Sequence, residues 1–99
     1  SAFELFPRES DITINSKKII FEVVAGSEDD LIKVEKIFDE TKFSVELESL
    51  IFEKDTHKYT YTYVVTALNS GYLDNISFNV GYRDYTFADK GEDYFPAGI

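Results

Sequence analysis

The chain has 99 residues, of which ten are basic and nineteen are acidic, so its formal net charge is −9. One domain with one core fits this length, and a hydrophobic fraction of 43% is ample for that core. The negative charge disfavours nucleic acids and anionic lipid surfaces as partners, while the absence of cysteine excludes disulfides and thiolate chemistry. Solubility alone explains such acidity, although it also favours a basic patch on a protein partner.

We expect residues 1–99 to form a single domain, in which residues 1–10 are a lead-in and residues 88–99 are an irregular tail. Two segments rich in β-branched residues, Asp11–Asn15 and Ile19–Ala25, are typical of strands. They form either a tight hairpin of two short strands or one strand interrupted by a bulge.

The next pattern predicts a helix over Glu28–Thr41. Ser27 precedes it as an N-cap, and Asp30 stands where the acid of a capping box reaches back. Apolar residues then recur at helical spacing, and the charged residues between them face solvent. The apolar positions are Leu31, Val34, Ile37 and Phe38.

From Phe43 the period of the apolar residues changes to two, which predicts a half-buried strand. The run Leu50-Ile51-Phe52 breaks this alternation and indicates either a bulge near Ser49 or burial on both faces. A polar hairpin loop, Glu53–Lys58, leads into a second long strand, Tyr59–Leu68.

Asn69-Ser70-Gly71 is a turn signal. After it, apolar residues alternate along a last long strand from Ile76 to Tyr82, with a continuation through Phe87 left open. The order of elements is therefore strand, helix, strand, strand, strand. This order predicts an α+β fold, a two-layer sandwich of one main helix and a mostly antiparallel sheet of about four or five strands.

Tyrosines gather on one face of the strand Tyr59–Leu68 and define a candidate protein interface. Tyrosine brings a large contact area with little entropy loss, which favours it at interfaces. Two alternatives stay open: the rings only cover the sheet or pack under the helix, or an exposed strand edge pairs with another copy of the domain. The residues of the candidate interface are Tyr59, Tyr61, Tyr63, Val65 and Tyr82.

The sequence offers no catalytic or metal-binding constellation. His57 is the only histidine, and its neighbour Thr56 is too near in sequence to act as its nucleophile, so we expect a solvent-exposed loop histidine. One histidine without cysteine argues against zinc, and the segment Asp89–Asp93 lacks the spacing of an EF-hand calcium loop. We therefore expect no enzymatic activity, no cofactor and no metal.

The stretch from Ile12 to Leu68 resembles the periplasmic-type domain of the PilO/GspM class, bitopic assembly proteins of type IV pili and type II secretion. The resemblance implies a ferredoxin-like domain that is not an enzyme and that pairs with itself or with a PilN-like sister protein. It also implies an extracytoplasmic location (the periplasm or the outer face of the cytoplasmic membrane), with a missing N-terminal segment as anchor. One departure is that no second helix lies between the later strands, so the ferredoxin-like fold is incomplete. The pattern consists of a strand over Ile19–Ser27, an acidic-capped helix over Asp30–Phe38, a strand over Val45–Leu50 and a hairpin returning through Tyr59–Leu68.

These observations predict a scaffold domain of a type IV pilus or type II secretion assembly complex, which forms homo- or heterodimers through the tyrosine-bearing strand and the helix. The alternative is an extracellular surface or adhesin-type domain that recognises a ligand through an aromatic sheet face. A third class is a small enzyme or regulatory domain that binds a metabolite in a deep pocket.

Overall fold

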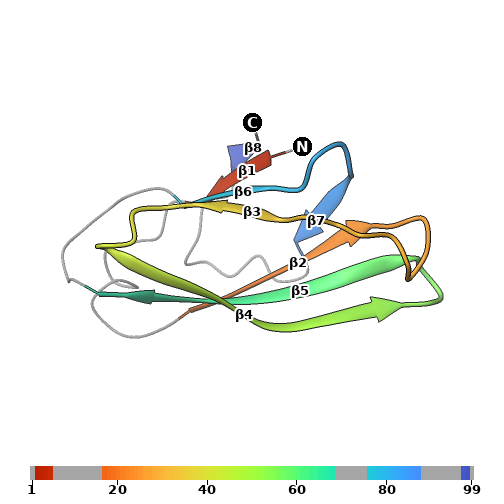
Figure 1. Ribbon diagram of the computed structural model, residues 1–99, viewed down its shortest axis with the longest axis horizontal. Coiled ribbons are helices and arrows are strands. Elements are labelled where there is room, and N and C mark those ends of the chain that lie inside the picture. The colour runs from red at the N-terminus through yellow and green to blue at the C-terminus, as the bar shows by residue number, and fades with distance from the viewer. Residues whose placement is uncertain (1, 6–16, 69–75, 88–96, 99) are drawn as a thin grey trace.

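A computed structural model describes residues 2–5, 17–68, 76–87 and 97–98 of the chain (Figure 1). The described residues form eight strands and no helix, so the fold is all β. The strands are β1 (Ala2–Leu5), β2 (Lys17–Val24), β3 (Glu35–Ile37), β4 (Phe43–Glu53), β5 (Lys58–Ala67), β6 (Ile76–Asn79), β7 (Tyr85–Phe87) and β8 (Ala97–Gly98).

The strands form two sheets, which lie one above the other as the layers of a β-sandwich (Figure 1). Sheet A has the strand order β3-β6-β1-β8, and sheet B has the order β4-β5-β2-β7. All the described pairings are antiparallel. The predicted α+β sandwich with one main helix is therefore wrong, and the ferredoxin-like fold that the family resemblance implies is wrong with it.

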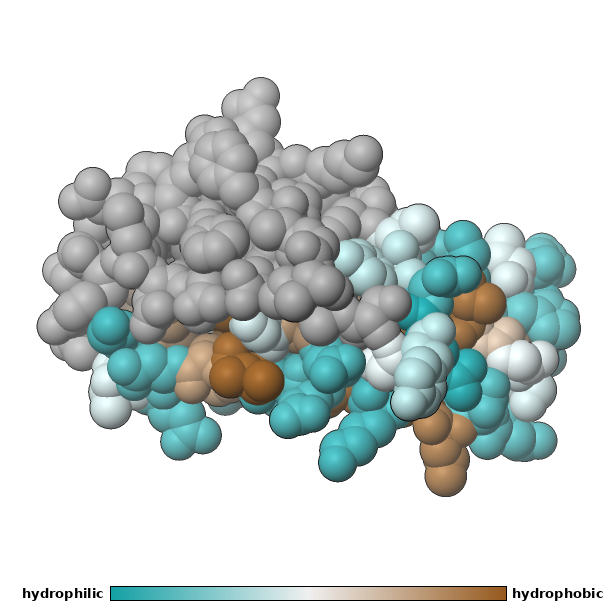
Figure 2. Space-filling view, turned by 90° about the horizontal axis from the view of Figure 1, so that it is seen from above, coloured by the Kyte–Doolittle hydropathy of each residue, from teal (hydrophilic) through white to brown (hydrophobic). Residues whose placement is uncertain are grey.

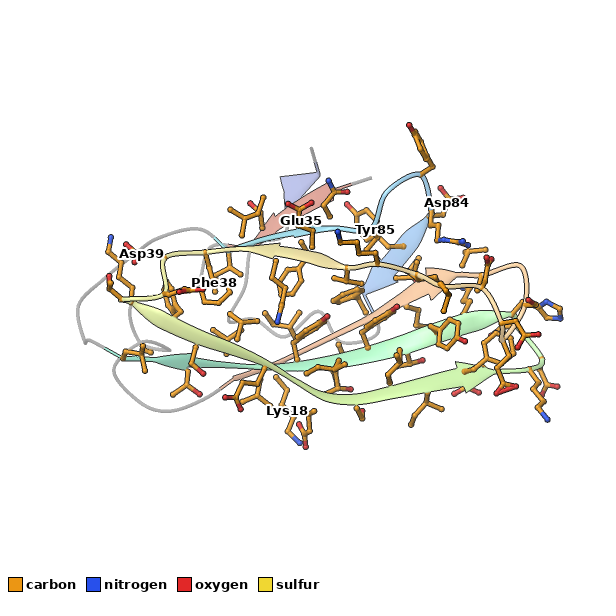
Figure 3. All side chains as sticks on the ribbon, viewed as in Figure 1. Lys18, Glu35, Phe38, Asp39, Asp84 and Tyr85 are labelled. Carbon is orange, nitrogen blue, oxygen red and sulfur yellow. The ribbon has the colours of Figure 1, made fainter. Side chains whose placement is uncertain are left out.

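The predicted helix Glu28–Thr41 is in fact a turn followed by extended chain and the short strand β3. Ile32, Val34 and Phe38 are partly buried and pack against the core, as Figure 3 shows for Phe38. By contrast, Leu31 is 96% exposed. Inward residues at even positions have the period of an extended chain, which β-branched side chains favour.

The acidic residue that predicted the helix N-terminus has another role. Asp30 Oδ2 accepts the backbone N–H of Gly26 at 2.8 Å and a hydrogen bond from Arg83 Nη1 at 2.9 Å. Arg83 also donates to the carbonyl oxygen of Val24 at 3.3 Å. Asp30 therefore fastens the turn after β2 to the segment that leads into β7, and it does not cap a helix.

Aromatic rings from both sheets form the centre of the core. Phe21 of β2 is fully buried, and its ring stacks on those of Tyr61 and Tyr63 at centroid distances of 5.3 and 5.9 Å. From sheet A, Phe78 of β6 meets Phe21 edge-on at 5.5 Å and Tyr63 at 5.2 Å. Such pairs add about 0.5–1.5 kcal/mol each to the stabilisation from area burial, so this cluster joins the two layers.

Several strand predictions are confirmed. β2 lies at the predicted strand Ile19–Ala25, and β4 and β5 form the predicted hairpin around the loop Glu53–Lys58. The register between β4 and β5 shifts between Leu47 and Ser49, so of the two alternatives, a bulge near Ser49 or burial on both faces, the bulge is present. His57 is exposed at the end of the hairpin turn, where its φ of 54° is left-handed.

The predicted last strand from Ile76 to Tyr82 is wrong in extent, because β6 ends at Asn79. Gly81 has a φ of +72°, and its backbone N–H donates to Asn79 Oδ1 at 2.9 Å. This turn passes the chain from β6 in sheet A to β7 in sheet B. The end segments contribute the short strands β1 and β8, while the predicted elements Asp11–Asn15, Asn69–Gly71 and residues 88–96 of the tail lie outside the described residues.

Candidate functional site

Three of the five residues of the candidate interface lie inside the sandwich. Tyr61 and Tyr63 are each 4% exposed and Val65 is 5% exposed, because this face of β5 points at sheet A. The tyrosine-bearing face therefore packs the core, which is one of the alternatives left open by the sequence. A partner has no access to it while the two sheets are packed together.

Burial changes the pKa values of these two tyrosines. Burial, with a smaller contribution from Tyr61, raises the pKa of Tyr63 to about 12, and burial also raises the pKa of Tyr61. The ammonium of Lys36, on β3, lies 5.4 Å from the centroid of the Tyr63 ring and donates to the carbonyl oxygen of Val45 at 3.4 Å. Lys36 thus links the edge strand β3 of sheet A to the edge strand β4 of sheet B.

The two remaining tyrosines of the candidate interface lie apart from each other. Tyr59 is half-buried beside Phe52, with ring centroids 4.9 Å apart, and its hydroxyl donates to the carbonyl oxygen of Glu28. Tyr82 is fully exposed in the turn between β6 and β7. The structure therefore does not bring the five predicted residues together into one surface.

A different accessible surface lies on β4, the edge strand of sheet B. No described strand pairs with the second edge of β4, which leaves one row of its backbone groups without a ladder partner in the described part of the chain. Large apolar side chains stay accessible there: Leu47 is 47% exposed, Leu50 46% and Ile51 55%. We call residues 47–53 the β4 edge.

The bulge explains why apolar side chains occur on both faces of the β4 edge. Leu50 is registered with Tyr61 and Phe52 with Tyr59, so both point toward the interior. Ile51, between them, is registered with Thr60 on the outer face of sheet B. The sequence signal was the broken alternation at Leu50-Ile51-Phe52, which indicated the bulge but not that this half of the strand remains uncovered.

A hollow of about 210 Å³ borders the inner side of the β4 edge. Leu50, Tyr59 and Tyr61 line it together with residues 30–33. Leu31 and Lys33 are exposed, and the hollow opens to solvent. Asp30 also lines it, and its hydrogen bonds from Arg83 and from the backbone of Gly26 hold the pKa of its carboxyl below the usual value.

The outer face beside the β4 edge is acidic. Glu46 and Glu53 are exposed and share the outward face of Ile51, because they are registered with Val64 and Lys58. Within the described residues neither glutamate takes part in an ion pair. Glu48 at the bulge pairs with Lys18 at 3.0 Å, and Figure 3 shows Lys18 on the outer side of sheet B.

The surface on the side of sheet A mixes hydrophobic and hydrophilic groups (Figure 2). Figure 2 shows hydrophobic groups protruding between hydrophilic ones along the border that the grey residues leave uncovered.

The described residues give little support to a catalytic histidine or a metal site. His57 Nδ1 lies 3.2 Å from the carbonyl oxygen of Gly26, to which it donates, and not beside a hydroxyl nucleophile. The described ranges contain no group of three or more residues suited to hold a metal ion. Nor do they contain a helix of the length and apolarity needed to cross a membrane.

Fold and surface together define an all-β sandwich with one accessible, partly apolar strand edge. Comparisons of the chain with protein-family models, with curated protein sequences and with solved structures found no match. The chemistry of the surface itself therefore carries the functional argument.

Proposed function

We propose that this domain is a protein-interaction module that contacts its partner through the β4 edge. The supporting observation is that three large apolar side chains stay about half exposed along one edge strand whose second edge is unpaired in the described part of the chain. Exposed edges with apolar side chains attract further strands, which makes them docking sites when a partner is available.

The magnitude of the possible gain supports this proposal. Burying the exposed parts of three aliphatic side chains contributes roughly 2–4 kcal/mol, if half of the usual value for complete burial is counted for each. Backbone hydrogen bonds to an added strand contribute about 0.5–1.5 kcal/mol each. Both terms favour docking of a further strand, and they act against the cost of association.

The narrower prediction, a dimeric scaffold domain of a type IV pilus or type II secretion complex at an extracytoplasmic location, stays a prediction. Its structural premise was a ferredoxin-like domain with a helix, and this fold is contradicted. The proposal therefore rests on the β4 edge alone and specifies neither the assembly nor the compartment.

A selection experiment tests the proposal. Peptides are selected from a random display library on the purified chain, and the bound peptides are mapped by amide chemical-shift changes. We expect the strongest binders to shift the amides of residues 47–53. A selection that yields no binder, or binders that map to other surfaces such as the turn at Tyr82, would contradict the proposed role of the β4 edge.

A further inference from the structure

We infer that the β4 edge takes an extended basic segment of a protein partner, in which lysine or arginine alternates with apolar residues. The inference rests on the proposed function and adds the chemistry of the occupant. The segment adds to sheet B as a fifth strand beside β4, with its basic side chains outward and its apolar side chains inward. The two faces of β4 explain these two preferences separately.

The preference for apolar side chains on the inner face follows from the hollow beside Leu50. Side chains of an added strand lie about 5 Å from their cross-strand neighbours on the same face, so an inward residue opposite Leu50 enters the hollow. The hollow is lined by Leu50, Tyr59 and Tyr61, which favour an aliphatic or aromatic occupant. Lys33, which also lines the hollow, disfavours a basic side chain at this position.

The preference for basic side chains on the outer face follows from Glu46 and Glu53. Glu46 and Glu53 lie on the outer face of β4, separated by roughly 20 Å of strand. Neither takes part in an ion pair within the described residues, and Lys58, which is registered opposite Glu53, pairs instead with Glu22 at 4.0 Å. Outward lysine or arginine side chains of the added strand lie opposite or diagonal to them. The net charge of −9 steers a basic segment toward the domain before docking.

The same charges disfavour a second copy of the chain as the occupant. A symmetric antiparallel pairing of two β4 strands about Ser49 and Leu50 places Glu46 of each copy near Glu53 of the other. Like charges that face each other across strands are destabilising, and both copies carry the same net negative charge. Glutamates on a strand edge thus protect against self-association while they leave the edge open to a basic segment.

The first residues of β4, before Glu46, are not part of the site. Phe43 and Val45 are buried there, and Lys36 Nζ already donates to the carbonyl oxygen of Val45. The bulge near Glu48 then bends the strand, and Leu50, which follows the bulge, lines the hollow. An added strand therefore pairs with residues 47–53, and the side chain of Glu46 lies beside the end of the paired stretch.

The experiment compares a short synthetic peptide of alternating lysine and leucine with a peptide of alternating glutamate and leucine. Binding to the full chain is measured by fluorescence anisotropy at low and high salt, and the site is mapped by amide chemical shifts. We expect the basic peptide to bind at residues 47–53 at least about tenfold more tightly than the acidic one, with weaker binding at high salt.

A pair of charge-matched variants separates docking at the edge from general attraction to an acidic protein. Glu46→Gln/Glu53→Gln weakens binding of the basic peptide by roughly 3- to 10-fold, since two exposed ion pairs are lost. Glu28→Gln/Asp29→Asn removes the same charge from the exposed turn after β2, so it leaves the affinity within about twofold of that of the unchanged chain.

Four results would overturn the inference. These are equal affinity for the two peptides, equal weakening by the two variants, shifts that map outside residues 47–53, and a peptide-free dimer through β4 seen in sedimentation. If library-selected peptides that are not basic still map to the β4 edge, the basic-segment inference fails while the proposed function stands. If no peptide of any kind maps there, both fail.

Discussion

The burial of the tyrosine face predicts that Tyr63 holds the fold together and does not serve binding. Its side chain is 4% exposed and contacts rings from both sheets, with Phe78 at 5.2 Å and Phe21 at 5.9 Å. Truncation by Tyr63→Ala removes about 150 Å² of buried surface, which corresponds to about 4 kcal/mol at ~25 cal/mol per Å². Substitutions of this size in cores cost about 3–5 kcal/mol.

A loss of this size is a large part of the stability of a domain of this length, which is on the order of 5–15 kcal/mol. The assay is urea denaturation followed by circular dichroism, with the free energy of unfolding extrapolated to zero denaturant. The matched control is Tyr82→Ala, which removes the same atoms from a fully exposed turn and is expected to cost less than about 0.5 kcal/mol.

A third variant separates the ring from its hydroxyl. Tyr63→Phe keeps the ring contacts, so its cost is expected to stay within about 1.5 kcal/mol. Similar free energies of unfolding for Tyr63→Ala and Tyr82→Ala would show that the Tyr63 ring is not part of the core.

Three further predictions concern pH and backbone conformation. The pKa of Tyr63 in the folded state is about 12 and exceeds the unfolded value near 10. The contribution of Tyr63 to stability is therefore fully present below pH 10 and is lost as pH rises toward 12. If the tyrosinate absorbance of Tyr63 rose over the same pH range as that of an exposed tyrosine, this would be contradicted. Asp30 has a lowered pKa because Arg83 and the Gly26 backbone donate to it, so its contribution is present above about pH 4 and lost as pH falls through its folded pKa. Carboxyl chemical shifts report that pKa, and Arg83→Gln should raise it toward its usual value; an unchanged pKa would show that Arg83 has no part in it. His57 adopts a φ of 54°, so His57→Val is expected to destabilise the hairpin by about 1–2 kcal/mol more than His57→Gly, and equal thermal midpoints would exclude left-handed strain at this turn.

The sequence was informative where one period dominated. The alternation from Phe43 and along Tyr59–Leu68 predicted β4 and β5, and the break at Leu50-Ile51-Phe52 indicated either the bulge that is present or burial on both faces. In these segments the pattern of apolar residues and the turn residues agree, so local preference and tertiary packing select the same structure.

The helix prediction failed where two periods overlap. Leu31, Val34 and Phe38 fit a helix, but Val34 and Phe38 also fit an extended chain together with Ile32. The choice between them depends on partners distant in the sequence: Asp30 bonds to Arg83, and β3 pairs with β6. Contacts of this kind have no signature in a local window, so tertiary structure overrode the local pattern.

The candidate site shows the same limit. Clustered tyrosines are equally compatible with a surface and with the interior of a sandwich, and only the position of sheet A decides that Tyr61 and Tyr63 are buried. The accessibility of Leu47, Leu50 and Ile51 depends likewise on β4 being an edge strand, which is a property of strand order and not of local sequence.

Nuclear Overhauser contacts between aromatic rings are the most direct test of the β-sandwich. We expect contacts between Phe78 of sheet A and both Phe21 and Tyr63 of sheet B, together with extended-chain chemical shifts over residues 31–38. The absence of these ring contacts, combined with helical chemical shifts over residues 28–41, would contradict the sandwich and the accessible β4 edge that depends on it.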